Sequence, residues 1–395
     1  MGHRPVVTMV VHQDEETMTD TGIRQIPLAG PLIGDREREL VLDVLDSGVL
    51  ALGPFAETFE AAIAELAGRR FGVACSSGTA GLHMVVRALG IADGDEVITT
   101  PFSFVASANC LLYERARPRF VDIEEETLGL DPELVEAASG PRTRGILPVH
   151  VFGRPCRIEE IARIAETHRW HLIEDSCEAL GSRVGERPLG SFGAASVFAF
   201  YPNKQITTGE GGVVVTDDAA LAATFRSLRN QGRDEDGTWL RHIQLGYNYR
   251  LDELSAAIGV AQLERRAELA EARARVVAAY EAALGRHDWV SLPRSDPADT
   301  VDWFVYVVRL DPTVDRDRVI DALHARGVAS RPYFSPLHLQ PLYQELLGHR
   351  PGDFPVTERV AASTLALPFS PRLSDGDVAD VARALAEAVD MQVTP

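Results

Sequence analysis

Lys204 lies in the run FAFYPNKQITTGEGG, residues 198–212. The apolar start of this run predicts a buried strand, and the proline turn after it places the lysine just beyond the strand end. A lysine in such a place is poorly solvated, which favours its neutral amine over its ammonium form. Because a neutral amine attacks carbonyls, Lys204 is a candidate for a Schiff base with a carbonyl compound. A solvated lysine in a surface loop is the alternative that this run alone leaves open.

A second strand delivers acidic residues in the run HLIEDSCEALGS, residues 171–182. Its apolar residues end in Glu174 and Asp175, and ligands of open α/β sheets bind outside the carboxyl ends of strands. A carboxylate there can hold the protonated ring nitrogen of pyridoxal phosphate (PLP), whose cationic ring acts as an electron sink. Capping of the next helix by Asp175 is the competing interpretation.

A third strand leads into a possible phosphate cradle in the run FGVACSSGTAGLHMVVRALG, residues 71–90. Ser77, Gly78 and Thr79 come just before an apolar helix. The free N–H groups and the dipole at a helix start bind phosphate, and glycine lets the backbone approach it closely. An ordinary serine or threonine N-cap is the simpler interpretation of this tripeptide.

Cradle, ring-nitrogen acid and amine occur in that order, each after a predicted strand. From about Ile26 to near the C-terminus, the chain resembles the DegT/DnrJ type of nucleotide-sugar aminotransferase, which is PLP-dependent. The resemblance implies an α/β fold of the aspartate aminotransferase type (fold type I). In that fold a large PLP-binding domain has a mixed, mostly parallel sheet between helices, and a smaller α/β domain follows at the C-terminus. The motifs that carry the resemblance are SSGTAGLH, TTPFSFVASAN, IEDSCEALGS, FYPNKQITTGEGG and LGYNYRLDELSAAIG.

The resemblance assigns roles to the residues of the three motifs. Lys204 would carry PLP as a Schiff base and Asp175 would pair with the pyridine nitrogen, which makes these two the expected catalytic residues. Ser77, Gly78 and Thr79 would hold the cofactor phosphate. We expect no metal ion.

Four further residues receive roles in the same way. Phe104 would stack on the pyridine ring, which is a favourable apolar and π contact. Asn248 would reach the cofactor phosphate of a neighbouring subunit, so the resemblance implies a homodimer with shared active sites. Arg331 and His338 are expected on the substrate side.

Two positions depart from the common pattern of the family. Ala199 stands where a phosphate-binding serine is frequent, so that contact is lost or supplied elsewhere. Glu178 stands where glutamine or histidine is frequent near the phenolic oxygen of the cofactor. A carboxylate beside a phenolate is repulsive unless it is protonated or turned away. We retain Glu178 as an expected cofactor contact.

The expected reaction moves an amino group from L-glutamate to a keto-sugar, most simply a keto-deoxysugar linked to a nucleotide. A keto-polyol such as an aminocyclitol precursor would use the same residues. A PLP-dependent sugar dehydratase is less compatible, because the dehydratase subgroup replaces the lysine that is present here as Lys204. A non-catalytic regulator with this fold is a further alternative. A nicotinamide dehydrogenase is poorly supported, since no G-x-G-x-x-G follows the first strand.

Composition restricts the partners. The formal net charge of -19 disfavours nucleic acids and anionic membranes as partners, because both require basic surfaces. No apolar run approaches the roughly 20 residues of a membrane span. The four cysteines, Cys75, Cys110, Cys156 and Cys177, have no C-x-x-C spacing, which fits a reducing cytoplasm and a cytoplasmic location.

The order of elements predicts three parts. Residues 1–22 are expected to be a polar, disordered leader, 23–255 the PLP-binding domain, and 256–395 a linking helix and the small domain. Alternating strands and helices predict a largely parallel sheet, in which 212–216 could be antiparallel. We expect one long helix over 252–284. The small domain should contain strands at 303–310 and 328–333, a helix at 315–326 and a terminal helix from about 374.

Overall fold

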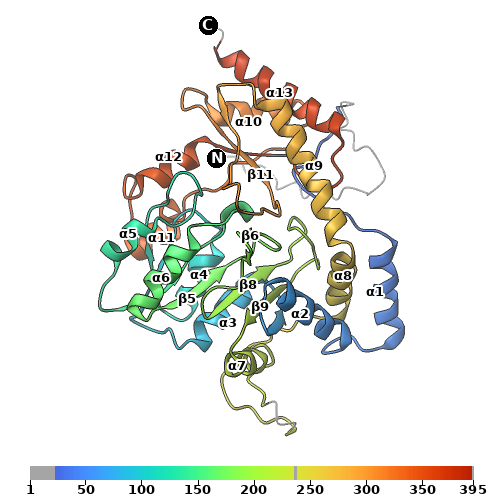
Figure 1. The fold of residues 1–395 in the computed structure, drawn as a ribbon, viewed down its shortest axis with the longest axis vertical. Helices are drawn as coiled ribbons and strands as arrows, with labels where there is room; N and C mark the ends of the chain where they lie inside the picture. Colours follow the sequence, from blue (N-terminus) through green and yellow to red (C-terminus); the bar gives the residue numbers. More distant parts are fainter. Residues whose placement is uncertain (1–22, 235–237, 394–395) are drawn as a thin grey trace.

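A seven-stranded sheet forms the centre of the larger part of the molecule (Figure 1). The computed structural model describes residues 23–234 and 238–393. Six strands run in the same direction, and β9 alone is antiparallel to both of its neighbours, β1 and β8. The strands, in spatial order, are β1 (Phe71–Cys75), β9 (Gly212–Thr216), β8 (Ala195–Ala199), β5 (His171–Asp175), β4 (Thr143–Leu147), β2 (Glu96–Thr99) and β3 (Arg117–Phe120).

Helices cover both faces of this sheet, so β9 and β8 are buried on both sides. On β9, Val214 packs into one apolar cluster, whereas Val213 and Val215 pack into another on the opposite face. Such doubly covered strands need continuous valine-rich runs, and GVVVT is one. The helices of this part are α1 (Asp35–Ser47), α2 (Pro54–Leu66), α3 (Gly78–Ala88), α4 (Ala106–Tyr113), α5 (Pro132–Ala138), α6 (Ile158–His168), α7 (Ala219–Arg229) and α8 (Glu253–Glu264).

The smaller part lies at one end of the molecule, at the top of Figure 1, and α7 lies at the other. Its antiparallel sheet has the order β10 (Val290–Ser291), β11 (Tyr306–Leu310), β12 (Thr364–Leu367). One apolar cluster joins this sheet to its longer helices. The helices of this stretch of the chain are α9 (Arg266–Leu284), α10 (Arg316–Ala325), α11 (Pro341–Leu347), α12 (Pro355–Ser363) and α13 (Asp375–Val393). Of these, α11 packs on the larger part, where Tyr343 shares an apolar cluster with Phe120. Short elements are the hairpin β6 (Arg183–Val184) and β7 (Arg187–Pro188) and the 3-10 turns η1 (Val151–Gly153) and η2 (Leu337–Leu339).

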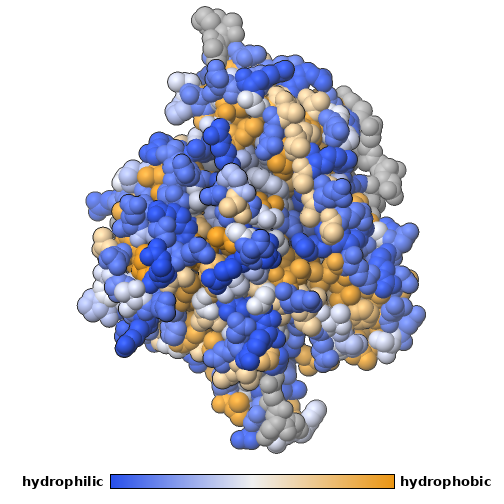
Figure 2. Space-filling view, in the orientation of Figure 1, coloured by the Kyte–Doolittle hydropathy of each residue, from blue (hydrophilic) through white to orange (hydrophobic). Residues whose placement is uncertain are grey.

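The predicted fold class is confirmed, and so is the antiparallel strand over 212–216. The domain boundary expected after residue 255 falls in the first turn of α8 and stays a prediction. The leader predicted over 1–22 lies outside the described residues. Figure 2 shows a largely hydrophilic face, with apolar residues gathered toward the side of α1, α2 and α8. In the described ranges, no helix is long and apolar enough to cross a membrane.

Two predicted elements are wrong. Residues 328–333 form only isolated bridges, Val328 with Ile26 and Arg331 with Ala366, because Pro332 lacks the N–H that a strand ladder needs. The third strand of the small sheet is β12 instead, which comes much later in the chain. The expected single helix over 252–284 is two helices, which meet at Arg265, where φ is -114° and ψ is 16°. The first helix packs on α1 and α2, whereas the second packs on α13.

Candidate active site

A cavity of about 530 Å³ opens at the carboxyl ends of the parallel strands. It is the place where open α/β sheets bind ligands. Residues from several strand ends and from the Tyr333–Phe334 segment of the smaller part contribute to its wall. Seven of the residues predicted from the sequence line it: Ser77, Gly78, Thr79, Phe104, Asp175, Glu178 and Lys204.

The start of α3 forms one wall of the cavity. The Ser77 hydroxyl accepts the Ala80 N–H at 3.1 Å, so the serine is a true N-cap. The Gly78 and Thr79 N–H groups, which precede Ala80 in the first turn, have no carbonyl partner inside the helix and can bind an anion. A Cβ on Gly78 would lie only 2.7 Å from the Ala199 Cβ and 2.8 Å from the Cys177 Sγ. The cradle therefore requires glycine at this position.

Asp175 ends β5 with its carboxylate in the cavity wall. The Ser107 hydroxyl donates to Oδ2 at 2.6 Å, and the Cys177 N–H donates to Oδ1 at 3.1 Å. Ser107 also contacts Ser103, whose hydroxyl lies 2.7 Å away. These two donors hold the carboxylate in one orientation, as a group that must meet a ring nitrogen requires.

Lys204 reaches the cavity from the turn after β8, and its Nζ lies 3.4 Å from Oε1 of Glu178. The same Nζ lies 4.0 Å from the centre of the Phe304 ring, a cation–π distance. The backbone carbonyl of Lys204 accepts a 3.0 Å hydrogen bond from Arg273. Lys204 is also the only lysine in the chain. That count is a direct signal for a special role, and the motif-based prediction did not use it.

Glu178 is 7 % exposed and is held at both oxygens. Its Oε2 accepts the Phe152 N–H at 2.9 Å, and its Oε1 faces Lys204. Burial raises the pKa of the Glu178 carboxyl, while the Lys204 charge and the Phe152 N–H oppose that rise. Phe152 has a positive φ of 61°, which is uncommon for a non-glycine residue and turns its N–H toward Glu178.

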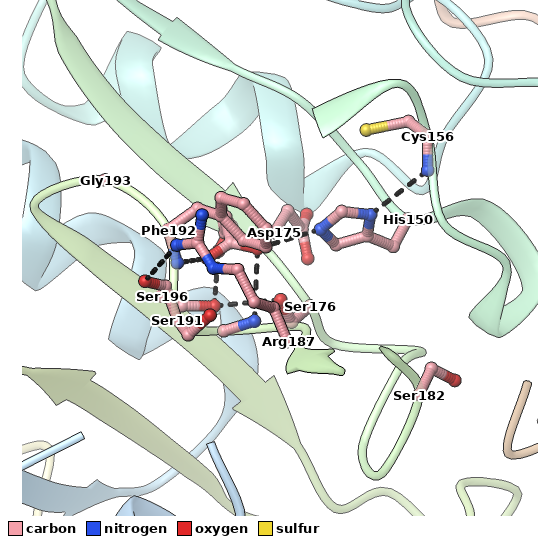
Figure 3. A network of polar contacts seen from close by, with 12 residues as sticks. His150, Cys156, Asp175, Ser176, Ser182, Arg187, Ser191, Phe192, Gly193 and Ser196 are labelled. Carbon is pink, nitrogen blue, oxygen red and sulfur yellow. Dashed lines mark hydrogen bonds and ion pairs between the residues drawn. The ribbon is translucent and has the colours of Figure 1, made fainter. Parts of the chain in front are cut away.

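Glu174, the residue before Asp175, points to the other side of β5, as strand alternation requires. It is fully buried, with its Oε2 3.0 Å from Nε2 of the equally buried His150. Its oxygens also accept the Gly190 N–H at 3.1 Å and the Phe192 N–H at 2.7 Å. The Cys156 N–H donates to the other ring nitrogen of His150 (Figure 3). This network ties loops together beneath the sheet and does not line the cavity.

The structure does not bring the remaining three predicted residues into this cavity wall. Asn248 is exposed, and its backbone bridges Asn230. His338 is fully buried against Glu358, with Nε2 3.0 Å from Oε1, and burial lowers its pKa. Arg331 donates to the backbone oxygen of Ser330 at 3.0 Å and contacts the ring of His324 at 3.1 Å. The roles of these residues stay predictions.

Three contributors to the site were missed from the sequence. They are Ser107, which holds Asp175, and Phe152 and Phe304, which hold Glu178 and Lys204. Ser107 lies within the quoted motif TTPFSFVASAN, so that motif contained the signal. The two phenylalanines carry no polar side chain, and only the folded chain shows that Phe152 acts through its backbone N–H and Phe304 through its ring.

The residues present fit PLP. The start of α3 in the cavity wall suits the phosphate, the oriented Asp175 suits the ring nitrogen, and Lys204 supplies the only side-chain amine of the chain. Across the described ranges, no group of three or more His, Cys, Asp or Glu side chains is placed to hold a metal ion.

Comparisons with known proteins agree with this chemistry. Residues 31–386 match the model of the DegT/DnrJ/EryC1/StrS aminotransferase family. GDP-perosamine synthase of Caulobacter vibrioides is 39% identical over 365 residues, which are 91% of this chain and 97% of the relative. The solved structure of DesI in the presence of its TDP-sugar product has a TM-score of 0.85 at 35% identity, with 93% of each chain covered.

A putative sugar aminotransferase of Streptococcus pneumoniae, Spr1654, has been solved in its pyridoxamine-phosphate (PMP) form. It superposes with a TM-score of 0.89 at 25% identity, covering 94% of this chain and 99% of that one. A family match across most of the chain, on a fold whose strand ends assemble the residues that PLP needs, settles the class. The chain belongs to the DegT/DnrJ/EryC1/StrS aminotransferase family and is a PLP-dependent sugar aminotransferase.

Proposed function

We propose that the protein transfers an amino group from L-glutamate to a keto-sugar carried on a nucleoside diphosphate, and that it does so as a homodimer. One observation carries the assignment of the reacting group: the only lysine of the chain lies in the same cavity as the oriented Asp175 and the α3 cradle. The nucleotide is inferred from two similar proteins, GDP-perosamine synthase and DesI with its TDP-sugar product.

Bound PLP supplies an electron sink that stabilises a carbanion next to the transferred nitrogen. The protein does the rest. The first turn of α3, with Ser77 and Thr79, binds the phosphate. Asp175 keeps the ring nitrogen protonated, and Ser107 fixes the direction of that carboxylate. Phe104, which lines the cavity, would cover one face of the ring.

Lys204 carries the proton transfers. Its Nζ, once free, would take the proton from the amino-bearing carbon of glutamate and pass it to the cofactor carbon that shares the nitrogen, after which water would release 2-oxoglutarate and leave the amino group with the cofactor. In the second half of the cycle the same atom moves a proton in the reverse sense and so forms the amino-sugar. Its contact with Glu178 keeps this amine within the cavity that Asp175 also lines.

A second copy of the chain would complete the mouth of the cavity. Phe104 and Tyr201 line the cavity, yet the two residues are 60% and 52% exposed in the single chain. Exposed aromatic residues at a site favour a covering partner. Tyr247 and Tyr249 point inward to Glu114 and His83, so the intervening Asn248 points outward, where it could reach a partner.

A spectroscopic titration tests this proposal. L-Glutamate should bleach the yellow band of the PLP-loaded enzyme and release 2-oxoglutarate, and a nucleoside-diphosphate keto-sugar should then restore the band. The acceptor panel should include GDP- and TDP-linked keto-sugars and a free keto-cyclitol, with K204A as the control. Restoration by the cyclitol alone would replace the nucleotide-sugar assignment, and no bleaching with glutamate would remove glutamate as the donor.

A further inference from the structure

Two neighbours of the Lys204 amine, a carboxylate and an aromatic ring, have no part in binding PLP to that amine. Nζ lies between the Glu178 carboxylate at 3.4 Å and the face of the Phe304 ring, whose centre is 4.0 Å away. A carboxylate and an aromatic face both stabilise an ammonium group over a neutral amine. The neutral amine, however, is the form that attacks a carbonyl. Nζ therefore has an ion-pair partner and an aromatic face as its neighbours in the fold.

The fold holds the Glu178 side chain in one position. Its side chain is buried, and the Phe152 N–H holds Oε2 at 2.9 Å, which leaves Oε1 directed at Nζ. The backbone carbonyl of Glu178 accepts a hydrogen bond from the buried Gln205, the residue next to Lys204. Both ends of the pair are thus joined through backbone as well as side chain.

Other ionisable groups also face this pair, and a test must separate them from Glu178. Asp175 and Cys177 lie on the same turn as Glu178, and Arg273 approaches from α9 but binds the carbonyl of Lys204, away from Nζ. Around the cavity the remaining groups are Tyr201, Glu210 and Tyr333. Burial raises the pKa of Tyr333 to about 12, so it is neutral across the working range. Of these groups, all within the described residues, Glu178 is the one that contacts Nζ.

We propose that Glu178 is a positioning residue that holds Lys204 as its ammonium partner whenever the amine is free. In this role Glu178 keeps the lysine amine at the reaction centre. The inference deepens the proposed function and rests on it for its place in the cycle, because the amine is free during the half-reaction that delivers the amino group. The contact itself is a property of the protein.

The single lysine makes a direct test possible. In cofactor-free protein, Lys204 and the α-amino group are the only aliphatic amines that can capture an aldehyde. The rate of PLP capture should be followed from about pH 6 to about pH 10, between the ordinary ranges of histidine and lysine, with borohydride trapping and intact mass as the readout. K204A gives the background of the α-amino group, and pyridoxal gives the profile without a phosphate.

We expect E178Q to move the pH midpoint of capture at Lys204 down by at least one unit. Below both midpoints this shift corresponds to at least tenfold faster capture, because the neutral fraction changes tenfold per unit. The matched variant is E210Q, which removes the same charge from an exposed residue of the same cavity wall. It should shift the midpoint by less than a third of the E178Q shift.

Equal shifts in E178Q and E210Q, or no shift in E178Q, would overturn the inference. If E178Q does not fold, E178H supplies a second neutral side chain above its own titration range. Capture requires neither amino donor nor sugar. A shifted midpoint in an enzyme that does not respond to glutamate would therefore refute the proposed function and support the Glu178–Lys204 pair. An enzyme that responds to glutamate but shows no shift in E178Q would support the proposed function and refute the pair.

Discussion

Glu174 and Asp175 are adjacent acids on β5 that face opposite sides of the sheet. Glu174 is enclosed by His150 and the N–H groups of Gly190 and Phe192, and no ligand can reach it. Asp175 keeps only two donors and opens into the cavity. A buried carboxylate can therefore serve in two ways. The hydrogen bonds of Glu174 are all taken up by the protein, whereas Asp175 is oriented by the protein for a ligand.

The largest expected effect is on the cavity side. D175N should lower the transamination rate about a thousandfold or more, equivalent to about 4 kcal/mol in the barrier. The amide has nearly the same shape and can still accept from Ser107, so folding should be retained, but it cannot hold a protonated ring nitrogen. Steady-state kinetics with parallel thermal unfolding measures both. A rate within tenfold of the parent enzyme would remove Asp175 from its proposed role.

On the other face of the sheet, removal of Glu174 should lower stability and not the chemistry of the site. E174A leaves His150 and two buried N–H groups without their acceptor, and we expect a loss of about 3–5 kcal/mol in the free energy of unfolding. Whatever fraction stays folded should still bind PLP at Lys204. Urea unfolding measures the loss, and E166A, an exposed position on α6, is the control with less than about 0.5 kcal/mol expected. A mild loss for E174A would show that the network is dispensable.

The phosphate cradle at the start of α3 should not tolerate a side chain at Gly78. G78A places a Cβ against Ala199 and Cys177, and such overpacking costs about 1–3 kcal/mol. We expect PLP affinity to fall about tenfold, measured by titration of cofactor-free protein. G140A, where a Cβ meets nothing within 4 Å, should leave the affinity unchanged. Equal affinities in the two variants would mean that the α3 turn does not need close packing to bind the phosphate.

The smallest expected effect is that of E178Q on the free energy of unfolding, and it depends on pH. Burial raises its pKa in the folded state above the unfolded value, so the native state binds more protons and stability falls as pH rises from about 4.5. E178Q lacks this loss. In cofactor-free protein, its stability relative to the parent should therefore improve between pH 5 and pH 8, by less than about 1 kcal/mol. Urea unfolding at both pH values tests the sign, and a relative decline would contradict it.

Much of the site could be predicted because strand ends and helix starts are local patterns. The strand that ends at Asp175, the helix start at Ser77 and Gly78, and the strand that leads to the Lys204 turn all formed as expected. The small sheet was harder to predict, because β11 pairs with β12 across more than fifty residues, and the short run TLAL has no strong strand signal of its own. The break at Arg265 depends on which helices pack on either side of it.

The contacts that orient the site also required the fold. Ser107 meets Asp175 across 68 positions of the chain, and the Phe152 N–H reaches Glu178 only because the backbone turns at a positive φ. Neither contact follows from periodicity. The motif resemblance named the reacting groups, whereas the folded chain shows what holds them in place.

Borohydride reduction of the PLP-loaded enzyme, followed by intact mass and peptide mapping, tests the central claim most directly. With a single lysine in the chain, we predict one reduced PLP adduct per chain, on the peptide that contains Lys204, and its loss after prior treatment with L-glutamate. An enzyme that transaminates yet carries no adduct at Lys204, or carries it on the α-amino group alone, would contradict the account.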